Sequence, residues 1–192
     1  MNTKKDRSST KACIQGPTLI NPKIYNDSRG FFMESWNQER FNSIIGKEIT
    51  FVQDNHSYSK RCVLRGLHYQ INPQAQGKLV RCISGEIFDV AVDIRKNSKT
   101  FGKWIGYFLN SENHLQFWIP EGFAHGFLTT SNSAEVLYKT TAFWSKSHER
   151  SLRWDDPSIN IIWPKDTKDI KVSEKDSSAD LLLNVDPNLL FE

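Results

Sequence analysis

The stretch Cys62–Gln70 reads C-V-L-R-G-L-H-Y-Q, and the interpretation of the whole chain starts from it. Its valine, leucines and tyrosine are typical of a β-strand, and they surround a single histidine, His68. In a regular strand His68 and Arg65 project to opposite faces, because successive side chains alternate. A bulge at Gly66 would relax that alternation and bring Arg65 and His68 to one site. We therefore expect a strand with a candidate site around His68.

The composition favours an ordinary globular domain. The chain has 192 residues, of which 38% are hydrophobic and 24% charged. Its net charge of +3 and the lack of a dense basic run fit an anionic small-molecule ligand and argue against nucleic-acid binding. No signal peptide or bilayer-spanning apolar run occurs, so no membrane association is expected. Cys13, Cys62 and Cys82 form no CxxC pattern, and we expect reduced thiols in a cytoplasmic protein.

The hydrophobic pattern predicts many short strands. Residues 36–46 have helical spacing and end at Gly46, which predicts a short helix. From Ile49 the period changes to two, and turn signals such as Asn55-His56-Ser57 separate most segments. This alternation favours an antiparallel sandwich or barrel. The expected strands are 18–20 paired with 23–25, 31–35, 49–53, 63–70, 78–84, 86–94, 103–109, 115–119, 122–129 and 134–143.

The two ends of the chain differ from this middle part. Residues 1–16 are polar and rich in Lys, Ser and Thr, and we expect a loose leader there. Residues 145–192 hold Asp- and Pro-rich turns, followed by a short helical piece at 179–183. No internal repeat or linker divides the chain, so we expect one domain that spans residues 1–192.

The segment 86–94, E-I-F-D-V-A-V-D-I, has two distinct faces. Phe88 and every second residue after it are apolar and predict a core face. The opposite face carries Asp89 and Asp93. These carboxylates either meet solvent or line a polar cavity in the mouth of a barrel.

Several side chains with acid–base or ion-binding chemistry recur along the chain. A lone histidine on a strand is usually a packed or surface residue, so the argument for a functional site rests on all the candidate residues together and not on His68 alone. The close His-x-His pair of a metal-binding cupin is absent, and we expect no metal site. Nucleophile, phosphate-loop and dinucleotide motifs are also absent. Acid–base chemistry on a bound anionic ligand, with a neutral imidazole as the base, is what remains. The candidates are Arg29, Glu34, Gln53, Asn55, Arg65, His68, Lys78, His125, Tyr138 and Asp176.

Several longer motifs occur in order along the chain. They are R-G-L-H-Y-Q at 65–70, G-K-L-V-R-C at 77–82, G-E-I-F-D-V-A-V-D-I-R at 85–95, T-F-G-K-W at 100–104, W-I-P-E-G-F-A-H-G-F at 118–127 and L-Y-K at 137–139. Together they resemble one known family, that of dTDP-4-dehydrorhamnose 3,5-epimerase, and the resemblance runs from about Ile20 to Asp176. It implies a mainly β, cupin-like jelly roll (a double-stranded β-helix) with short helices near both termini, a homodimer, and no cofactor. It also implies conversion of dTDP-4-dehydro-6-deoxy-D-glucose to dTDP-4-dehydro-β-L-rhamnose, in dTDP-L-rhamnose and cell-surface polysaccharide synthesis.

The same resemblance implies a role for each candidate. His68 would be the base and Tyr138 the acid, with Lys78 stabilising the enolate oxygen. Asp176 would orient the imidazole of His68, and Asp89 is the alternative carboxylate for that role. The implied substrate-binding residues are Arg29, Glu34, Gln53, Asn55, Arg65, His125, Glu149 and Lys175. In the family the N-terminal strands contribute to the partner's site, so Arg29 and Glu34 are expected to act across the dimer interface.

Other functions compete with the leading one. A related epimerase acting at C3 or C5 only would carry nearly the same motifs. A nucleotide-sugar-binding protein without turnover is disfavoured by the joint presence of His68, Lys78 and Tyr138. A metal-dependent cupin oxygenase is the third alternative. The chain is rich in aromatic residues, with 12 Phe and 6 Trp, and no single ring stands out as the platform for the thymine base.

Overall fold

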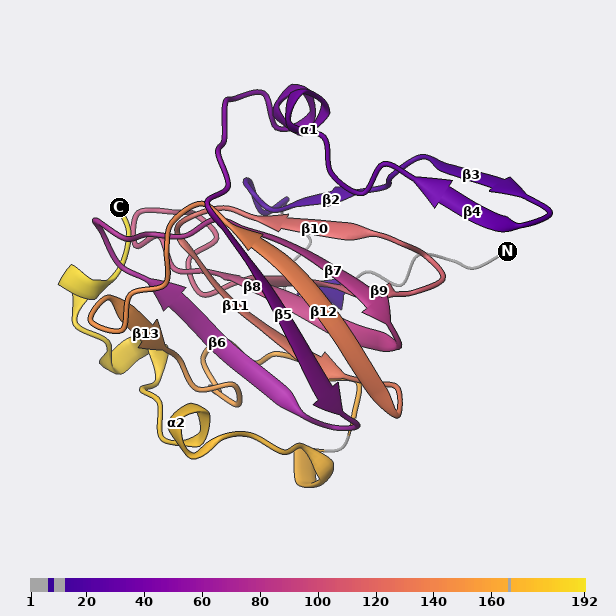
Figure 1. The fold of residues 1–192 in the computed structure, drawn as a ribbon. Helices are drawn as coiled ribbons and strands as arrows, with labels where there is room; N and C mark the ends of the chain where they lie inside the picture. The colour runs from indigo at the N-terminus through magenta and orange to yellow at the C-terminus, as the bar shows by residue number, and fades with distance from the viewer. Residues whose placement is uncertain (1–6, 9–12, 166) are drawn as a thin grey trace.

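The structure is a computed structural model that describes residues 7–8, 13–165 and 167–192. Two antiparallel sheets face each other and form the barrel of a jelly roll (Figure 1). The six-stranded sheet has the order β1-β9-β8-β11-β6-β13, and the five-stranded sheet has the order β2-β10-β7-β12-β5. A third, two-stranded sheet, β3-β4, projects away from the barrel as a hairpin. The mainly β, cupin-like fold class expected from the sequence is confirmed.

The elements have the following bounds: β1 Arg7–Ser8, β2 Thr18–Ile20, β3 Ile24–Asp27, β4 Gly30–Met33, α1 Gln38–Ile45, β5 Gln53–Lys60, β6 Leu64–Gln70, β7 Lys78–Ser84, β8 Glu86–Asp93, β9 Trp104–Asn110, β10 Gln116–Ile119, β11 Phe123–Thr129, β12 Ser133–Thr140, β13 Glu149–Ser151, η1 Thr167–Asp169, α2 Glu174–Ser177, η2 Leu182–Asn184 and η3 Pro187–Leu189.

Apolar side chains fill three layers. The first lies between the sheets and includes Val80, Phe117 and Ala91, from strands of both sheets. The second covers the outer face of the six-stranded sheet, where the C-terminal segment packs against it through Trp163 and Leu182. The third lies where α1 covers the outer face of the five-stranded sheet, with Phe41 on Trp118, Leu79 and Ile20. Because both faces of the sheet are covered, β8 is buried from Ile87 to Asp93 and β11 is buried along its whole length.

Helix α1 confirms the helical prediction for 36–46. The side chain of Asn37 accepts a hydrogen bond from the Arg40 N–H and caps the N-terminus. Gly46 ends the helix in the left-handed conformation with φ 78°, and its N–H donates to the Asn42 carbonyl. A residue without a Cβ is favoured there, which is why the sequence signal was reliable.

Three of the local predictions were wrong. The turn expected at Asn55-His56-Ser57 lies inside β5, and the expected strand 49–53 contributes only Gln53 to it. Strand β2 pairs with β10 and β3 with β4, so 18–20 and 23–25 do not pair with each other. The helical piece expected at 179–183 is instead the 3₁₀ turn η2 at Leu182–Asn184.

The predicted leader lies partly outside the described residues, which omit 1–6 and 9–12. Its described part is attached to the barrel. Arg7–Ser8 pair with β9, and Ile14 is buried in the layer between the sheets. The barrel therefore begins within residues 1–16, for which the composition had predicted a loose leader.

A bulge separates Arg65 from His68, as the sequence had suggested. His68 lies opposite His125 of β11, and Arg65 lies opposite Phe127, so two residues of β6 face Gly126 alone. Gly66 has φ +123°, and a Cβ there would lie 2.6 Å from the Gly126 Cα and 2.7 Å from the His125 carbonyl oxygen. The backbones of β6 and β11 thus approach each other more closely than any side chain at Gly66 would allow.

We predict that Gly66→Ala lowers the free energy of unfolding by more than Gly30→Ala does. Both glycines have a positive φ, but nothing lies within 4 Å of a Cβ at Gly30, whereas at Gly66 it overlaps backbone atoms. The conformational strain common to both costs about 1–3 kcal/mol, and Gly66→Ala adds the overlap. Urea unfolding followed by tryptophan fluorescence measures both variants. If both variants lose the same free energy of unfolding, β6 and β11 accommodate the added methyl group at no energetic cost, and the prediction is wrong.

Candidate active site

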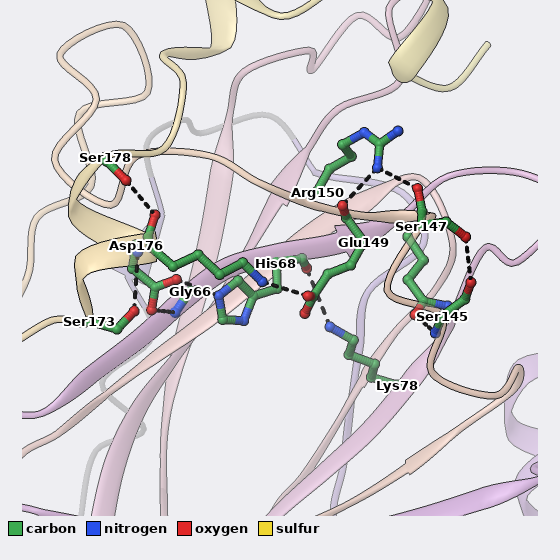
Figure 2. Close-up of polar contacts among 12 residues, drawn as sticks. Gly66, His68, Lys78, Ser145, Ser147, Glu149, Arg150, Ser173, Asp176 and Ser178 are labelled. Carbon is green, nitrogen blue, oxygen red and sulfur yellow. Dashed lines mark hydrogen bonds and ion pairs between the residues drawn. The ribbon is translucent and has the colours of Figure 1, made fainter.

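His68 on β6 is held by a buried carboxylate from the C-terminal segment. Its Nε2 lies 2.6 Å from Oδ1 of Asp176 on α2, and Figure 2 shows the two side chains facing each other. The Gly66 N–H donates to the other oxygen at 3.3 Å, and the Asp176 N–H donates to Ser173 Oγ at 3.1 Å. Burial alone raises the pKa of Asp176, but the bonds to His68, Gly66 and Ser173 outweigh it and lower that pKa below its ordinary value. Asp176 is therefore an anion that orients the ring of His68.

Two backbone bridges hold α2 against the barrel. Before the helix, Lys171 forms a parallel bridge with Val63, with the Leu64 N–H donating to the Lys171 carbonyl at 2.9 Å. After the helix, Asp180 bridges Leu152, next to the end of β13. These anchors explain how a residue more than 100 positions from His68 reaches it. Of the two carboxylates that the sequence left open, Asp176 is the one that contacts His68.

Asp89 contacts a different histidine. It lies on β8 with no solvent exposure, and its Oδ1 is 2.5 Å from Nε2 of His125 on β11. The second face of segment 86–94 therefore points into the barrel, and its two carboxylates do not meet solvent. Asp93, further along the same strand, accepts hydrogen bonds from Arg95, Ser98 and Thr100.

Lys78 and Tyr138 come from the facing five-stranded sheet. Lys78 on β7 is buried, and its Nζ donates to the His68 carbonyl at 3.3 Å (Figure 2). Burial lowers the pKa of Lys78 to about 8, although Glu149 and Asp89 oppose that shift. Burial raises the pKa of Tyr138 on β12 above its ordinary value, partly offset by Arg65. A phenol with a raised pKa keeps its proton at neutral pH.

These groups border one cavity at the mouth of the barrel, with a volume of about 540 Å³. The six-stranded sheet contributes Arg65, His68 and His125, and the five-stranded sheet contributes Lys78 and Tyr138. Arg65 is fixed by Ser59 Oγ at 2.9 Å and the Tyr58 carbonyl at 3.1 Å. The sequence suggested that a bulge at Gly66 brings Arg65 and His68 to one site, and in the structure both residues border this cavity.

A smaller space of about 90 Å³ continues from it. Gln53 and Asn55 of β5 border this space and are joined by a hydrogen bond of 2.8 Å. Trp144, which is exposed, borders both spaces, and its backbone N–H donates to Gln53 Oε1. At the rim Lys175 Nζ lies 2.5 Å from Oε2 of Glu149. Burial raises the pKa of Glu149, but Lys175, together with His68 and Trp144, outweighs it and lowers that pKa below its ordinary value.

Two predicted site residues lie elsewhere in this single chain. Arg29 is exposed at the tip of the β3-β4 hairpin, where it pairs with Asp27 at 2.6 Å. Glu34 pairs with Arg40 at 2.7 Å and borders a separate cavity of about 330 Å³ beside α1. Neither contributes to the cavity that contains His68 within one copy of the chain.

The sequence did not single out Ser57 and Ser173, which also border the large cavity. Ser57 was hidden by the wrong turn prediction at 55–57. The alternation of Gln53, Asn55, Ser57 and Ser59 on β5 was the signal that could have found it. The inner face of β5 lines a cavity and not a hydrophobic core, so its side chains are polar. A polar sequence of this kind is typical of a turn, which is why the strand was not predicted.

No group of three or more His, Cys, Asp or Glu side chains within residues 7–8, 13–165 and 167–192 is placed to hold a metal ion. None of the helices in those residues is both long and apolar enough to cross a bilayer.

Comparison with known proteins points to one family. A family model described as dTDP-4-dehydrorhamnose 3,5-epimerase matches residues 11–184. The dTDP-4-dehydrorhamnose 3,5-epimerase of Shigella flexneri is 56% identical over 176 residues, which are 92% of this chain and 96% of that protein.

Solved structures agree. The Legionella pneumophila dTDP-6-deoxy-D-glucose-3,5-epimerase in complex with dTDP-4-keto-L-rhamnose has a TM-score of 0.89 and 47% identity, covering 97% of this chain and 98% of its own. The 3'-monoepimerase ChmJ of Streptomyces bikiniensis, in complex with dTDP-quinovose, has a TM-score of 0.83 and 31% identity, covering 90% and 86%. With its fold, its cavity and these similarities taken together, the chain belongs to the dTDP-4-dehydrorhamnose 3,5-epimerase family.

Proposed function

We propose that this protein is an isomerase that converts dTDP-4-dehydro-6-deoxy-D-glucose to dTDP-4-dehydro-β-L-rhamnose, in the synthesis of dTDP-L-rhamnose for cell-surface polysaccharide. One observation carries the proposal. A carboxylate-tethered imidazole, His68, and a protonated phenol, Tyr138, come from the two facing sheets and border the same cavity. Epimerisation needs a base on one face of the sugar and an acid on the other, and this arrangement supplies both.

The chemistry follows from the ketone at C4 of the sugar. His68 removes the proton from C3 or C5, and the electron pair of that C–H bond moves to the C4 oxygen to form an enolate. Buried, cationic Lys78 is the group that stabilises this oxyanion. Tyr138 then delivers a proton to the opposite face of the same carbon, and solvent returns each residue to its starting state. Only protons move and nothing is oxidised, so the reaction needs no cofactor.

The remaining residues hold the sugar and the nucleotide of the substrate. Among the described residues, Arg65 has neutral acceptors only, Ser59 and the Tyr58 carbonyl, so its charge is free to meet the diphosphate. Trp144 has an exposed ring and borders the same smaller space as Gln53, where a thymine base would stack. The substrate-binding assignments are therefore Gln53, Asn55, Arg65, His125, Glu149 and Lys175.

We also propose that the working unit is a homodimer in the cytoplasm. The β3-β4 hairpin projects from the barrel with Phe31 and Phe32 exposed, which suits an interface with a second copy (Figure 1). Such an interface would carry Arg29 and Glu34 to the partner's cavity. The three cysteines are free thiols, which fits a reducing compartment.

Deuterium uptake tests the reaction. With dTDP-4-dehydro-6-deoxy-D-glucose in D₂O, we expect label and inversion at both C3 and C5. His68→Asn should slow exchange by about 10² to 10⁴-fold, the usual contribution of a general base. His56→Asn is the matched control, because His56 is exposed and pairs with Glu135 away from the cavity. Inversion at one carbon would indicate a single-site epimerase, and unchanged exchange in His68→Asn would refute the base assignment.

Tyr138→Phe should separate proton removal from proton delivery. The variant keeps the ring but lacks the hydroxyl, so His68 still removes protons while delivery to the opposite face fails. We expect exchange at one carbon to survive better than net epimerisation, as measured by NMR in D₂O. If exchange and inversion fall by the same factor, Tyr138 has another role.

The pH dependence should report Lys78. Its pKa of about 8 means that the ammonium loses its charge, and with it the stabilisation of the enolate, as pH rises through that value. We therefore expect kcat/KM to fall on the alkaline side near pH 8. Lys78→Arg should remove that decline, whatever its own rate, because a guanidinium stays charged. An unchanged alkaline limb in this variant would assign the decline to another group.

A further inference from the structure

The pair formed by His125 and Asp89 takes no part in the proton transfers above, although His125 borders the same cavity. His125 is 7% exposed and Asp89 is fully buried. Their contact, 2.5 Å between Nε2 and Oδ1, is as close as that between His68 and Asp176. Two histidine–carboxylate pairs therefore meet one cavity, and both use Nε2 for the carboxylate.

Strand register explains why the two pairs lie together. His125 and His68 are directly opposite each other on β11 and β6, so their side chains leave the sheet on the same face. Asp89 on β8 is opposite Phe127, which places it diagonally to His125 across the β8-β11 pair. A carboxylate and an imidazole reach each other across such a diagonal.

The surroundings of Asp89 indicate which of the two ring nitrogens of His125 carries the hydrogen. The second carboxylate oxygen, Oδ2, is buried without a hydrogen-bond partner among the described residues. An ionised Asp89 has His125 as its hydrogen-bond donor among the described residues, which places the hydrogen of the ring on Nε2. The other ring nitrogen, Nδ1, makes no hydrogen bond to the described part of the chain, and the residue borders the cavity.

We propose that Asp89 is a positioning residue that fixes the tautomer of His125, so that Nδ1 accepts a hydrogen bond from a hydroxyl group of the bound sugar. This inference rests on the proposed function, which supplies a sugar with free hydroxyls. Pockets built to bind a hydroxyl discriminate strongly against analogues that lack it. His125 accordingly determines which sugar is bound and does not contact the nucleotide.

Electrostatics supports an acceptor at Nδ1. Burial lowers the pKa of His125, and Lys78 from β7 and His68 from β6 lower it further. Asp89 from β8 acts in the opposite direction, but burial prevails. A ring that is neutral near pH 7 has one nitrogen with a hydrogen and one that accepts, and Asp89 decides which faces the sugar.

The experiment compares Asp89→Asn with Asp93→Asn. Both aspartates are fully buried on β8, but Asp93 is held by Arg95, Ser98 and Thr100 away from the cavity. Titration calorimetry with dTDP and with dTDP-glucose separates nucleotide from sugar binding. Long-range ¹H–¹⁵N NMR of the wild-type protein reads the tautomer of His125 directly, and that reading does not require any variant to fold.

We expect Asp89→Asn to weaken dTDP-glucose binding and kcat/KM by about 10- to 100-fold, the range for removing the orienting partner of a metal-bound histidine. Binding of dTDP should not change, and Asp93→Asn should leave both affinities at wild-type values. A wild-type His125 with its hydrogen on Nδ1, or wild-type dTDP-glucose affinity in Asp89→Asn, would overturn the inference. Failure of the wild-type protein to epimerise would instead overturn the proposed function, while NMR and calorimetry still decide the role of Asp89.

Discussion

The close approach of β6 and β11 at Gly66 and Gly126 is the constraint on which the site depends. It displaces the register by one residue, so Arg65 and His68 reach the same cavity although they are three positions apart. The same bulge turns the Gly66 N–H toward Asp176, which then holds His68. A side chain at Gly66 would separate the strands and disturb all of these contacts at once.

The charges around the cavity are paired in a consistent way. The two carboxylates that border it are each paired with another group of the site, Asp176 with His68 and Glu149 with Lys175, and the buried Asp89 is paired with His125. Among the described residues, Lys78 and Arg65 have neutral oxygen acceptors only. The positive charge that remains unpaired is therefore directed at the cavity, which suits a diphosphate and a transient enolate. Of the paired groups, the imidazole of His68 is the one proposed to transfer protons, and Asp176 orients it.

Much of this arrangement could be predicted from the sequence, and the failures have a physical cause. Strands with one apolar face, such as β8, and the glycine-ended helix α1 follow from periodicity and capping. Most of strand β5 was missed because its inner face is polar. Without apolar residues at every second position, the sequence lacks the period-two signal of a strand and resembles a turn. The assignment of Asp89 and Asp176 to two different histidines depends on strand register and on a tail that returns to the barrel. Neither is encoded in local spacing.

The C-terminal segment that covers the outer face of the six-stranded sheet also carries Asp176 on α2. Asp176 is thus synthesised after the strands β6, β7 and β12, which carry His68, Lys78 and Tyr138. A nascent chain that has completed β13 already holds these three side chains, but its His68 imidazole lacks the carboxylate that contacts it in the folded protein. Docking of this segment therefore both covers the hydrophobic layer on the six-stranded sheet and brings Asp176 to His68.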